Sequence, residues 1–130
     1  MNKNSVSRLS VWGALFALQA GLSVAMGAFG AHGLAHKVSS QALGWWQTSS
    51  DYLMYHSLAG LLVIALISQI HHSIAILRCF FLGNFLFAGS LYVMTLTDLT
   101  WLGMITPLGG LAYLIGWGVF VWCFIRSRSN

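Results

Sequence analysis

Histidine, tyrosine and hydroxyl side chains gather near one end of several apolar segments of this chain. Imidazole with oxygen donors can ligate a divalent metal or relay protons near neutral pH. The candidate polar cluster consists of His32, Tyr52, Tyr55, His56, Tyr92 and Thr106. Its members come from separate segments, and the chain has no HExxH or cysteine-rich pattern. We therefore expect mainly structural polar contacts here, with no bound metal or cofactor.

His56 is the most informative member of this cluster, because it lies a turn inside an apolar segment. Ionisable groups within membrane segments are functional candidates. Tyr52 lies one helical turn earlier on the same face, so the pattern predicts a hydrogen bond between the two residues. Ser57 follows His56 directly, which on a helix separates their directions by about 100°. The two make a weak catalytic pair, and we expect no enzymatic activity.

Two amides, Gln19 and Asn84, lie close to the middle of their apolar segments. A side-chain amide in hydrocarbon must find a hydrogen-bond partner, and such groups usually face the interior of a helix bundle. Their equal depth predicts that they bond each other. The structural interpretation is a bond between helices, worth about 0.6 kcal/mol on average. The functional alternative is a polar waypoint in a transport pathway.

Four long apolar segments must position these groups. They cover residues 9–31, 52–70, 74–96 and 101–125 of a chain of 130 residues. About 20 apolar residues cross the hydrocarbon core of a bilayer as a helix. Charged residues make up 6% of the chain, against roughly 25% in soluble domains. The sequence predicts an all-α fold, a single domain over residues 1–130 with four transmembrane helices.

The formal charge of +4 does not indicate nucleic-acid binding. The cations are scattered at the ends of the apolar segments, whereas a nucleic-acid surface clusters them. They are Lys3, Arg8, Lys37, Arg78, Arg126 and Arg128. With both termini cytoplasmic, only Lys37 falls on the outer side, as the positive-inside rule favours. We therefore expect an N-in, C-in orientation.

Small residues repeat every four positions along the first segment, at Gly13, Ala17, Gly21 and Ala25. This spacing places them on one helical face, where another helix can approach closely. The same pattern can reflect the general abundance of glycine and alanine in membrane helices.

Capping and proline chemistry indicate where the second and fourth helices begin. Ser39 or Ser40 can cap a helix that starts at Gln41, while Trp45 and Trp46 suit the interfacial aromatic belt. The last helix either begins near Pro107, with Thr106 as its N-cap, or begins at Trp101 and kinks at the proline.

Several strings of this sequence resemble the YgdD-like family of small inner-membrane proteins, a family of unknown function. These strings are Gly27–Leu34, Tyr52–Ala59, Gly89–Tyr92 and Trp101–Gly110, the last leading to Gly116-Trp117. The resemblance implies a four-helix multi-pass protein of the bacterial cytoplasmic membrane. It assigns no reaction, substrate or ligand.

Two functions fit these observations. The first is an accessory or assembly subunit that packs against another membrane protein. The alternative is a small oligomeric transporter or channel for a proton or small solute, with a polar route past Gln19 and Asn84. The expected partners are the lipid bilayer and either a membrane protein or further copies of the chain.

Overall fold

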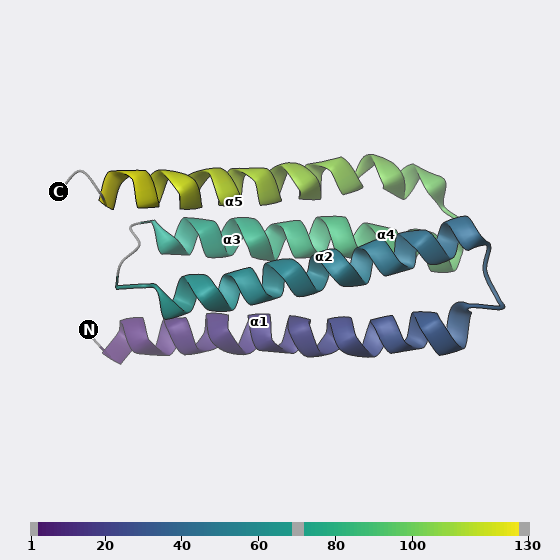
Figure 1. Ribbon diagram of the computed structural model, residues 1–130, viewed down its shortest axis with the longest axis horizontal. Coiled ribbons are helices and arrows are strands. Elements are labelled where there is room, and N and C mark those ends of the chain that lie inside the picture. The colour runs from purple at the N-terminus through teal and green to yellow at the C-terminus, as the bar shows by residue number, and fades with distance from the viewer. Residues whose placement is uncertain (1–2, 69–71, 128–130) are drawn as a thin grey trace.

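The chain folds into a bundle of antiparallel helices (Figure 1). The computed structural model describes residues 3–68 and 72–127. Its α-helices are α1 (Lys3–Phe29), α2 (Ser40–Ala65), α3 (Ser73–Gly83), α4 (Gly89–Thr97) and α5 (Thr106–Ser127). The described residues contain no β-strand, so the predicted all-α class is confirmed.

The helices α3 and α4 form one continuous rod, because a π-helical turn over Asn84–Ala88 joins them. Gly83 before the turn and Gly89 after it both keep right-handed helical backbone angles. Single π-helical turns inside α-helices occur frequently at functional sites. This one begins at Asn84, one of the two amides that the sequence places in mid-membrane.

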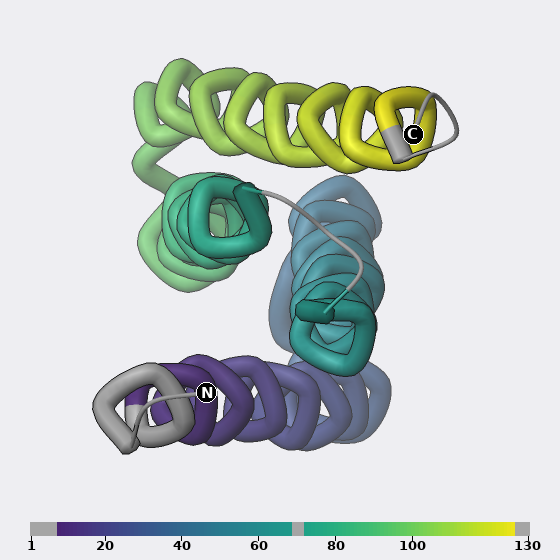
Figure 2. The backbone as a smooth tube through the Cα atoms, turned by 90° about the vertical axis from the view of Figure 1, so that its left-hand side faces the viewer, coloured from purple at the N-terminus to yellow at the C-terminus, as the bar shows by residue number. Residues whose placement is uncertain are grey.

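The bundle places α1 and α5 on opposite sides, with α2 and the α3–α4 rod between them (Figure 2). α1 packs on α2, and α5 packs on α3, while α2 contacts both α3 and α4. Polar groups on α2 therefore face several neighbouring helices and can bond across the bundle.

Three helical segments are long and apolar enough to cross a bilayer. They are Arg8–Leu34, Ser73–Thr97 and Thr100–Arg126. Each agrees within three residues at either end with a predicted span, 9–31, 74–96 or 101–125. The prediction of four spans is supported only in part, because α2 does not qualify by composition.

The helix α2 also differs in its bounds from the predicted span 52–70. It begins at Ser40 and ends at Ala65, and Ile70 lies outside the described residues. The capping prediction is confirmed, because Ser39 Oγ accepts a hydrogen bond of 3.1 Å from the Ala42 amide. The first half of α2 is rich in polar residues, which lowers its apolarity below that of a typical span.

Buried hydroxyl groups explain how α2 tolerates these polar residues. Ser49 Oγ donates to the Ala88 carbonyl at 2.7 Å, and Ser57 Oγ donates to the carbonyl of Leu53. Both serines are fully buried. Their hydroxyls are therefore satisfied inside the protein and do not face lipid.

The start of α5 follows the first of the two alternatives. α5 begins at Thr106, so Pro107 lies in its first turn, where the missing N–H has no cost. A 3₁₀ turn over Thr100–Met104 leads into it. The hydroxyl of Thr106 pairs with Ser90 Oγ at 2.8 Å and so links α5 to α4.

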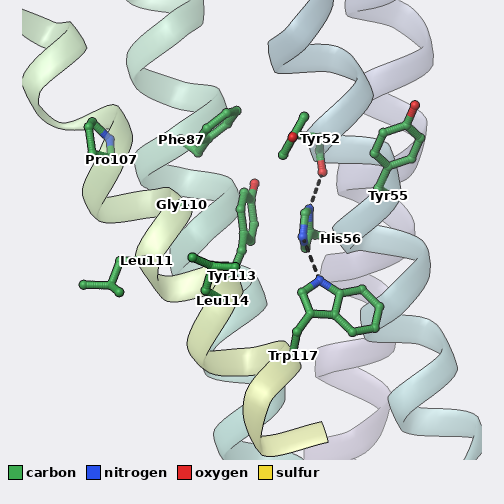
Figure 3. A pocket seen from close by; sticks show the side chains of 10 residues that line it. All are labelled: Tyr52, Tyr55, His56, Phe87, Pro107, Gly110, Leu111, Tyr113, Leu114 and Trp117. Atoms are coloured by element: carbon green, nitrogen blue, oxygen red, sulfur yellow. Dashed lines mark hydrogen bonds between the residues drawn. The ribbon is translucent and has the colours of Figure 1, made fainter. Parts of the chain in front are cut away.

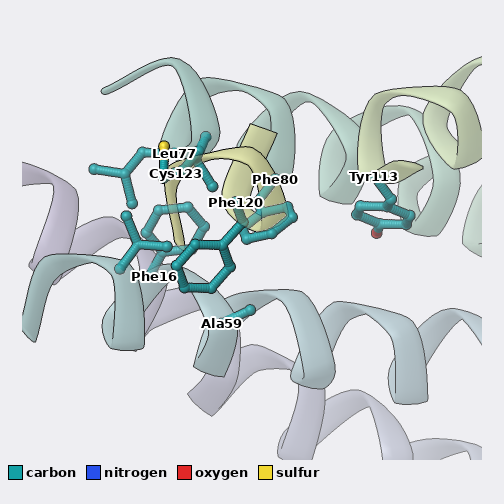
Figure 4. Packing of buried hydrophobic residues seen from close by; sticks show 9 residues of the cluster. Phe16, Ala59, Leu77, Phe80, Tyr113, Phe120 and Cys123 are labelled. Atoms are coloured by element: carbon teal, nitrogen blue, oxygen red, sulfur yellow. The ribbon is translucent and has the colours of Figure 1, made fainter. Parts of the chain in front are cut away.

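Bulky apolar side chains from α1, α2, α3 and α5 make the main core (Figure 4). Phe16, Val63, Ile76, Leu77 and Phe80 are completely buried in it. Trp46, one of the two tryptophans that suit the interfacial belt, is also buried within the protein. Its Nε1 donates a hydrogen bond of 2.7 Å to the Met26 carbonyl, so it ties α2 to α1.

Candidate functional site

His56 lies between α2 and α5, and both of its ring nitrogens have partners (Figure 3). Nδ1 lies 2.9 Å from the backbone carbonyl of Tyr52, which can only accept a hydrogen bond. Nε2 lies 3.2 Å from Nε1 of Trp117, which can only donate. The hydrogen-bond roles therefore assign the neutral tautomer with its proton on Nδ1. The predicted contact with Tyr52 exists, but through the backbone and not through the phenol.

The aromatic rings around His56 form a stacked shelf. The His56 ring lies 3.4 Å from that of Tyr113 with an interplanar angle of 10°. The Tyr52 ring stacks on Phe87 with centroids 4.7 Å apart. Together these contacts bridge α2, the π-helical turn and α5 with flat apolar surfaces.

A cavity of about 760 Å³ lies beside this shelf, between α2 and α5 (Figure 3). Its lining holds no lysine, arginine, aspartate or glutamate. The lining residues are Tyr52, Tyr55, His56, Phe87, Pro107, Gly110, Leu111, Tyr113, Leu114 and Trp117. This size falls within the range of about 300–1,000 Å³ that is typical of small-molecule sites. We call this cavity the α2–α5 groove.

Asn84 joins four helices at the inner side of the shelf. Its Nδ2 donates to Gln19 Oε1 at 2.9 Å and also lies 3.4 Å from Ser57 Oγ. Its Oδ1 accepts a bond of 2.8 Å from the hydroxyl of Tyr113. The predicted hydrogen bond between Gln19 and Asn84 is thus confirmed. Asn84 is buried, and every polar function of its side chain is used.

Local backbone geometry brings Tyr113 to Asn84. The Tyr113 ring lies directly against the Cα position of Gly83, where an added Cβ would overlap the ring. Gly109, one turn earlier on α5, lies equally close to the backbone of Phe87. These glycines let α5 approach the π-helical turn closely enough for the hydroxyl of Tyr113 to reach the amide.

Tyr92 belongs to a different cluster, nearer the end of the bundle where α2 begins. Its hydroxyl pairs with Ser50 Oγ at 2.8 Å, and its ring packs edge-on against Trp46. Ser23 from α1 donates to the Ser50 carbonyl at 2.8 Å. This cluster is fully bonded within the protein and lies outside the groove.

The remaining predicted residues do not join the groove. His32 is exposed near the end of α1, and Thr106 bonds Ser90 as described above. Over the described residues, no group of three histidine, cysteine, aspartate or glutamate side chains is placed to hold a metal ion. Of the predicted cluster, the structure brings together Tyr52, Tyr55 and His56.

Sequence reasoning missed the contribution of α5. Tyr113 and Trp117 lie four residues apart, so they share one face of this helix and both reach His56. A polar-tipped aromatic pair in the middle of a span was the available signal, since tyrosine and tryptophan otherwise favour the interfaces. Phe87 gave no such signal, because a phenylalanine in a span is ordinary.

The sequence matches a known protein family. The family model described as "Protein of unknown function (DUF423)" matches residues 26–110. This range includes every groove residue on α2 and on the rod, and it ends before Tyr113. No solved structure matches the chain.

Curated relatives are named as membrane proteins. The chain is similar to a UPF0382 membrane protein of Staphylococcus epidermidis, 48% identical over 110 residues, which cover 82% of this chain and 88% of the relative. It is 43% identical over 111 residues to the UPF0382 membrane protein YwdK of Bacillus subtilis, covering 82% and 89%. A Haemophilus influenzae UPF0382 membrane protein is 38% identical over 117 residues, covering 88% and 94%.

Proposed function

This chain belongs to the DUF423 family, and we propose that it is an accessory or assembly subunit that packs against another protein within the bacterial cytoplasmic membrane. We place the chain with the YgdD-like proteins and propose no catalytic reaction for it. The proposed partner contributes a transmembrane helix, which packs against the exposed face of α1.

One observation carries the proposal, namely that the small-residue strip of α1 faces away from the chain's own bundle. Ala17, Gly21 and Ala25 are exposed. A Cβ added at Gly13 or Gly21 would meet no atom within 4 Å. The strip therefore plays no part in packing α1 onto α2, although its spacing is the one that lets membrane helices approach closely.

The depth and length of this face favour a helix as partner. The strip extends over thirteen residues, from Gly13 to Ala25, whose Cα atoms span about 18 Å of helix. Within the bilayer no hydrophobic force drives helices together, so association relies on close van der Waals packing of such small residues. A partner helix that also presents small residues on one face could pack closely against this strip.

We further propose that α2 crosses the membrane as a fourth helix, in the N-in, C-in orientation. α1 begins and α5 ends at the same end of the bundle (Figure 1). If the three apolar segments all cross, the chain must return between α1 and α3, and α2 follows that path. Its polar side chains are accommodated because Ser49, Ser50 and Ser57 are buried.

The alternative function, a small oligomeric transporter or channel, has less support. Its polar route would pass Gln19 and Asn84, whose amides bond each other, as well as Ser57 and Tyr113. A solute entering that position would have to replace these bonds. We therefore interpret them as bonds that hold the four helices together.

The experiment is native mass spectrometry of the full chain, gently extracted from its own membrane, combined with a photo-crosslinking residue at Ala25. We expect one co-extracted polypeptide, which crosslinks to Ala25 and is lost in the Gly21→Leu variant. The matched control is Gly118→Leu on α5, because a Cβ there also meets no atom within 4 Å.

Three outcomes would contradict the accessory role. A homo-oligomer that dissociates with Gly21→Leu would move the assignment to self-association and revive the transporter alternative. A monomer with no crosslink at Ala25 would remove the basis of the proposal. Loss of the partner in both leucine variants would show that any bulky substitution disrupts the complex. That result would contradict the assignment of the α1 strip as the docking face.

A further inference from the structure

The α2–α5 groove lies on the flank of the bundle away from α1, so it is independent of the proposed α1 partner. α5 and α1 are on opposite sides of the molecule (Figure 2). In Figure 3 the side chains of Tyr113, Leu111 and Leu114 come from α5, while Tyr52, Tyr55 and His56 come from α2. Leu114 is 70% exposed, so the groove opens sideways, toward lipid in a membrane.

The size of the groove suits one lipid-like molecule and excludes a whole helix. From Pro107 to Trp117 it follows eleven residues of α5, a length of about 15 Å. That length is about half of the 30 Å hydrocarbon core, or one leaflet. A helix about 10–12 Å across would need on the order of 1,200 Å³ over this length, whereas the groove holds about 760 Å³.

The lining favours an uncharged occupant with a flat ring. No charged side chain faces the groove, and His56 is neutral in its observed hydrogen bonds. A carboxylate or phosphate head would therefore be left unpaired in an apolar site, at a large cost in free energy. Planar surfaces are abundant, because the rings of Tyr52, Tyr113 and Trp117 all border the groove and aromatic rings favour offset stacking.

Two phenol hydroxyls supply the polar recognition. Within the described residues neither Tyr52 nor Tyr55 makes a hydrogen bond through its hydroxyl, although both side chains border the groove. Tyr52 stacks on Phe87, which lies near the middle of the span Ser73–Thr97. A hydroxyl at that depth has no water to bond, so a hydrogen bond to an acceptor on a bound molecule stabilises it. A carbonyl oxygen on the occupant is such an acceptor.

We propose that the α2–α5 groove binds one neutral membrane-soluble quinone. The quinone ring lies against the aromatic shelf, and a ring carbonyl accepts a hydrogen bond from Tyr52. The apolar chain follows Leu111 and Leu114 along α5. This class combines the three properties that the groove selects, which are a flat uncharged ring, a carbonyl acceptor and a long hydrocarbon tail.

The test uses the full chain in phosphatidylcholine nanodiscs, an azido-ubiquinone photolabel and decylubiquinone as competitor. We expect labelled peptides from α2 and α5, and displacement of the label by decylubiquinone. Tyr52→Phe keeps the ring but removes the hydroxyl, and should weaken competition about threefold to tenfold, the net value of one hydrogen bond. Leu114→Trp fills the groove and should abolish saturable labelling.

The matched control is Leu18→Trp, because Leu18 is 69% exposed and lies on α1. It should leave the labelling unchanged, which separates filling of the groove from a general effect of a large side chain. Each variant is first checked for a native helical spectrum and a single elution peak, and Tyr52→Phe provides a mild variant should Leu114→Trp not fold.

Three results would overturn the proposal. The first is label spread evenly over α1 and α5. The second is equal displacement by palmitic acid with no effect of Tyr52→Phe, which would show that the groove accepts any hydrocarbon chain. The third is unchanged labelling in a folded Leu114→Trp variant. None of these results tests the proposed partner of α1. The quinone proposal can therefore be refuted without refuting the proposed function, and the reverse also holds.

Discussion

Trp117 on α5 donates its Nε1 hydrogen to Nε2 of His56 on α2, over 3.2 Å. The two residues are 61 positions apart in the chain, and helices α2 and α5 face each other across the groove at this point. The bond does more than join the helices, because it determines which imidazole nitrogen carries the proton.

This relationship predicts the tautomer of His56. Nitrogen-15 solid-state NMR of the protein in lipid should show a protonated Nδ1 and an unprotonated, hydrogen-bonded Nε2. The Trp117→Phe variant keeps an aromatic ring but removes the donor, so the Nε2 resonance should move toward the value of a ring nitrogen without a hydrogen bond. A proton found on Nε2 in the parent protein would contradict the assignment.

The Gln19–Asn84 bond predicts a measurable coupling between α1 and the α3–α4 rod. In a double-mutant cycle with Gln19→Leu and Asn84→Leu, the coupling in the free energy of unfolding should be about 0.6 kcal/mol. Asn84→Leu should cost more than Gln19→Leu, because it also removes the bonds to Ser57 and Tyr113. Reversible unfolding in bicelles supplies the free energies, and strictly additive effects would refute the pairing.

The close approach of α5 to the π-helical turn predicts a strong dependence on Gly109. A Cβ at this position meets the backbone of Phe87, which cannot rotate away. Gly109→Ala should therefore lower the free energy of unfolding by about 1–3 kcal/mol, as overpacking does. Gly118→Ala is the control, since its Cβ has open space, and it should be neutral or slightly stabilising. Equal effects of the two changes would argue against the tight contact.

The proposed topology predicts which sites a membrane-impermeant maleimide reaches in intact cells. In a background with Cys79 and Cys123 changed to alanine, a cysteine at Lys37 should react from outside. A cysteine at Arg8 should react only after the cells are opened. The reason is that Lys37 follows the first crossing, whereas Arg8 precedes it. The reverse pattern would exclude the N-in orientation.

Much of the fold follows from local sequence. Long apolar stretches dictate helices, because hydrocarbon leaves backbone groups no other way to be satisfied. The spans around Arg8–Leu34 and Ser73–Thr97 were therefore predictable to within a few residues. Backbone chemistry narrowed the cap of α2 to Ser39 or Ser40 and the start of the last helix to Pro107 or Trp101, and the structure selects Ser39 and the start near Pro107.

The bounds of α2 show where such reasoning fails. Its serines made the first half look like a link, because apolarity was the only criterion for a span. In the bundle Ser49 and Ser50 face protein and bond within it. Composition cannot distinguish a polar residue that faces water from one that is satisfied by a neighbouring helix. The predicted span therefore began only at residue 52, although the helix itself begins at Ser40, one residue before the start that the capping serines indicated.

By itself, the sequence determined the membrane setting, the helical class and the pairing of Gln19 with Asn84, because hydrophobic length and the depth of polar groups are local quantities. Only the tertiary structure decided that Tyr113 and Trp117 meet His56, and that Tyr92 belongs elsewhere. The rotation of each helix about its axis sets these contacts, and close packing at Gly83 and Gly109 fixes that rotation for α5. Such packing depends on residues far apart in the chain, which no single segment specifies.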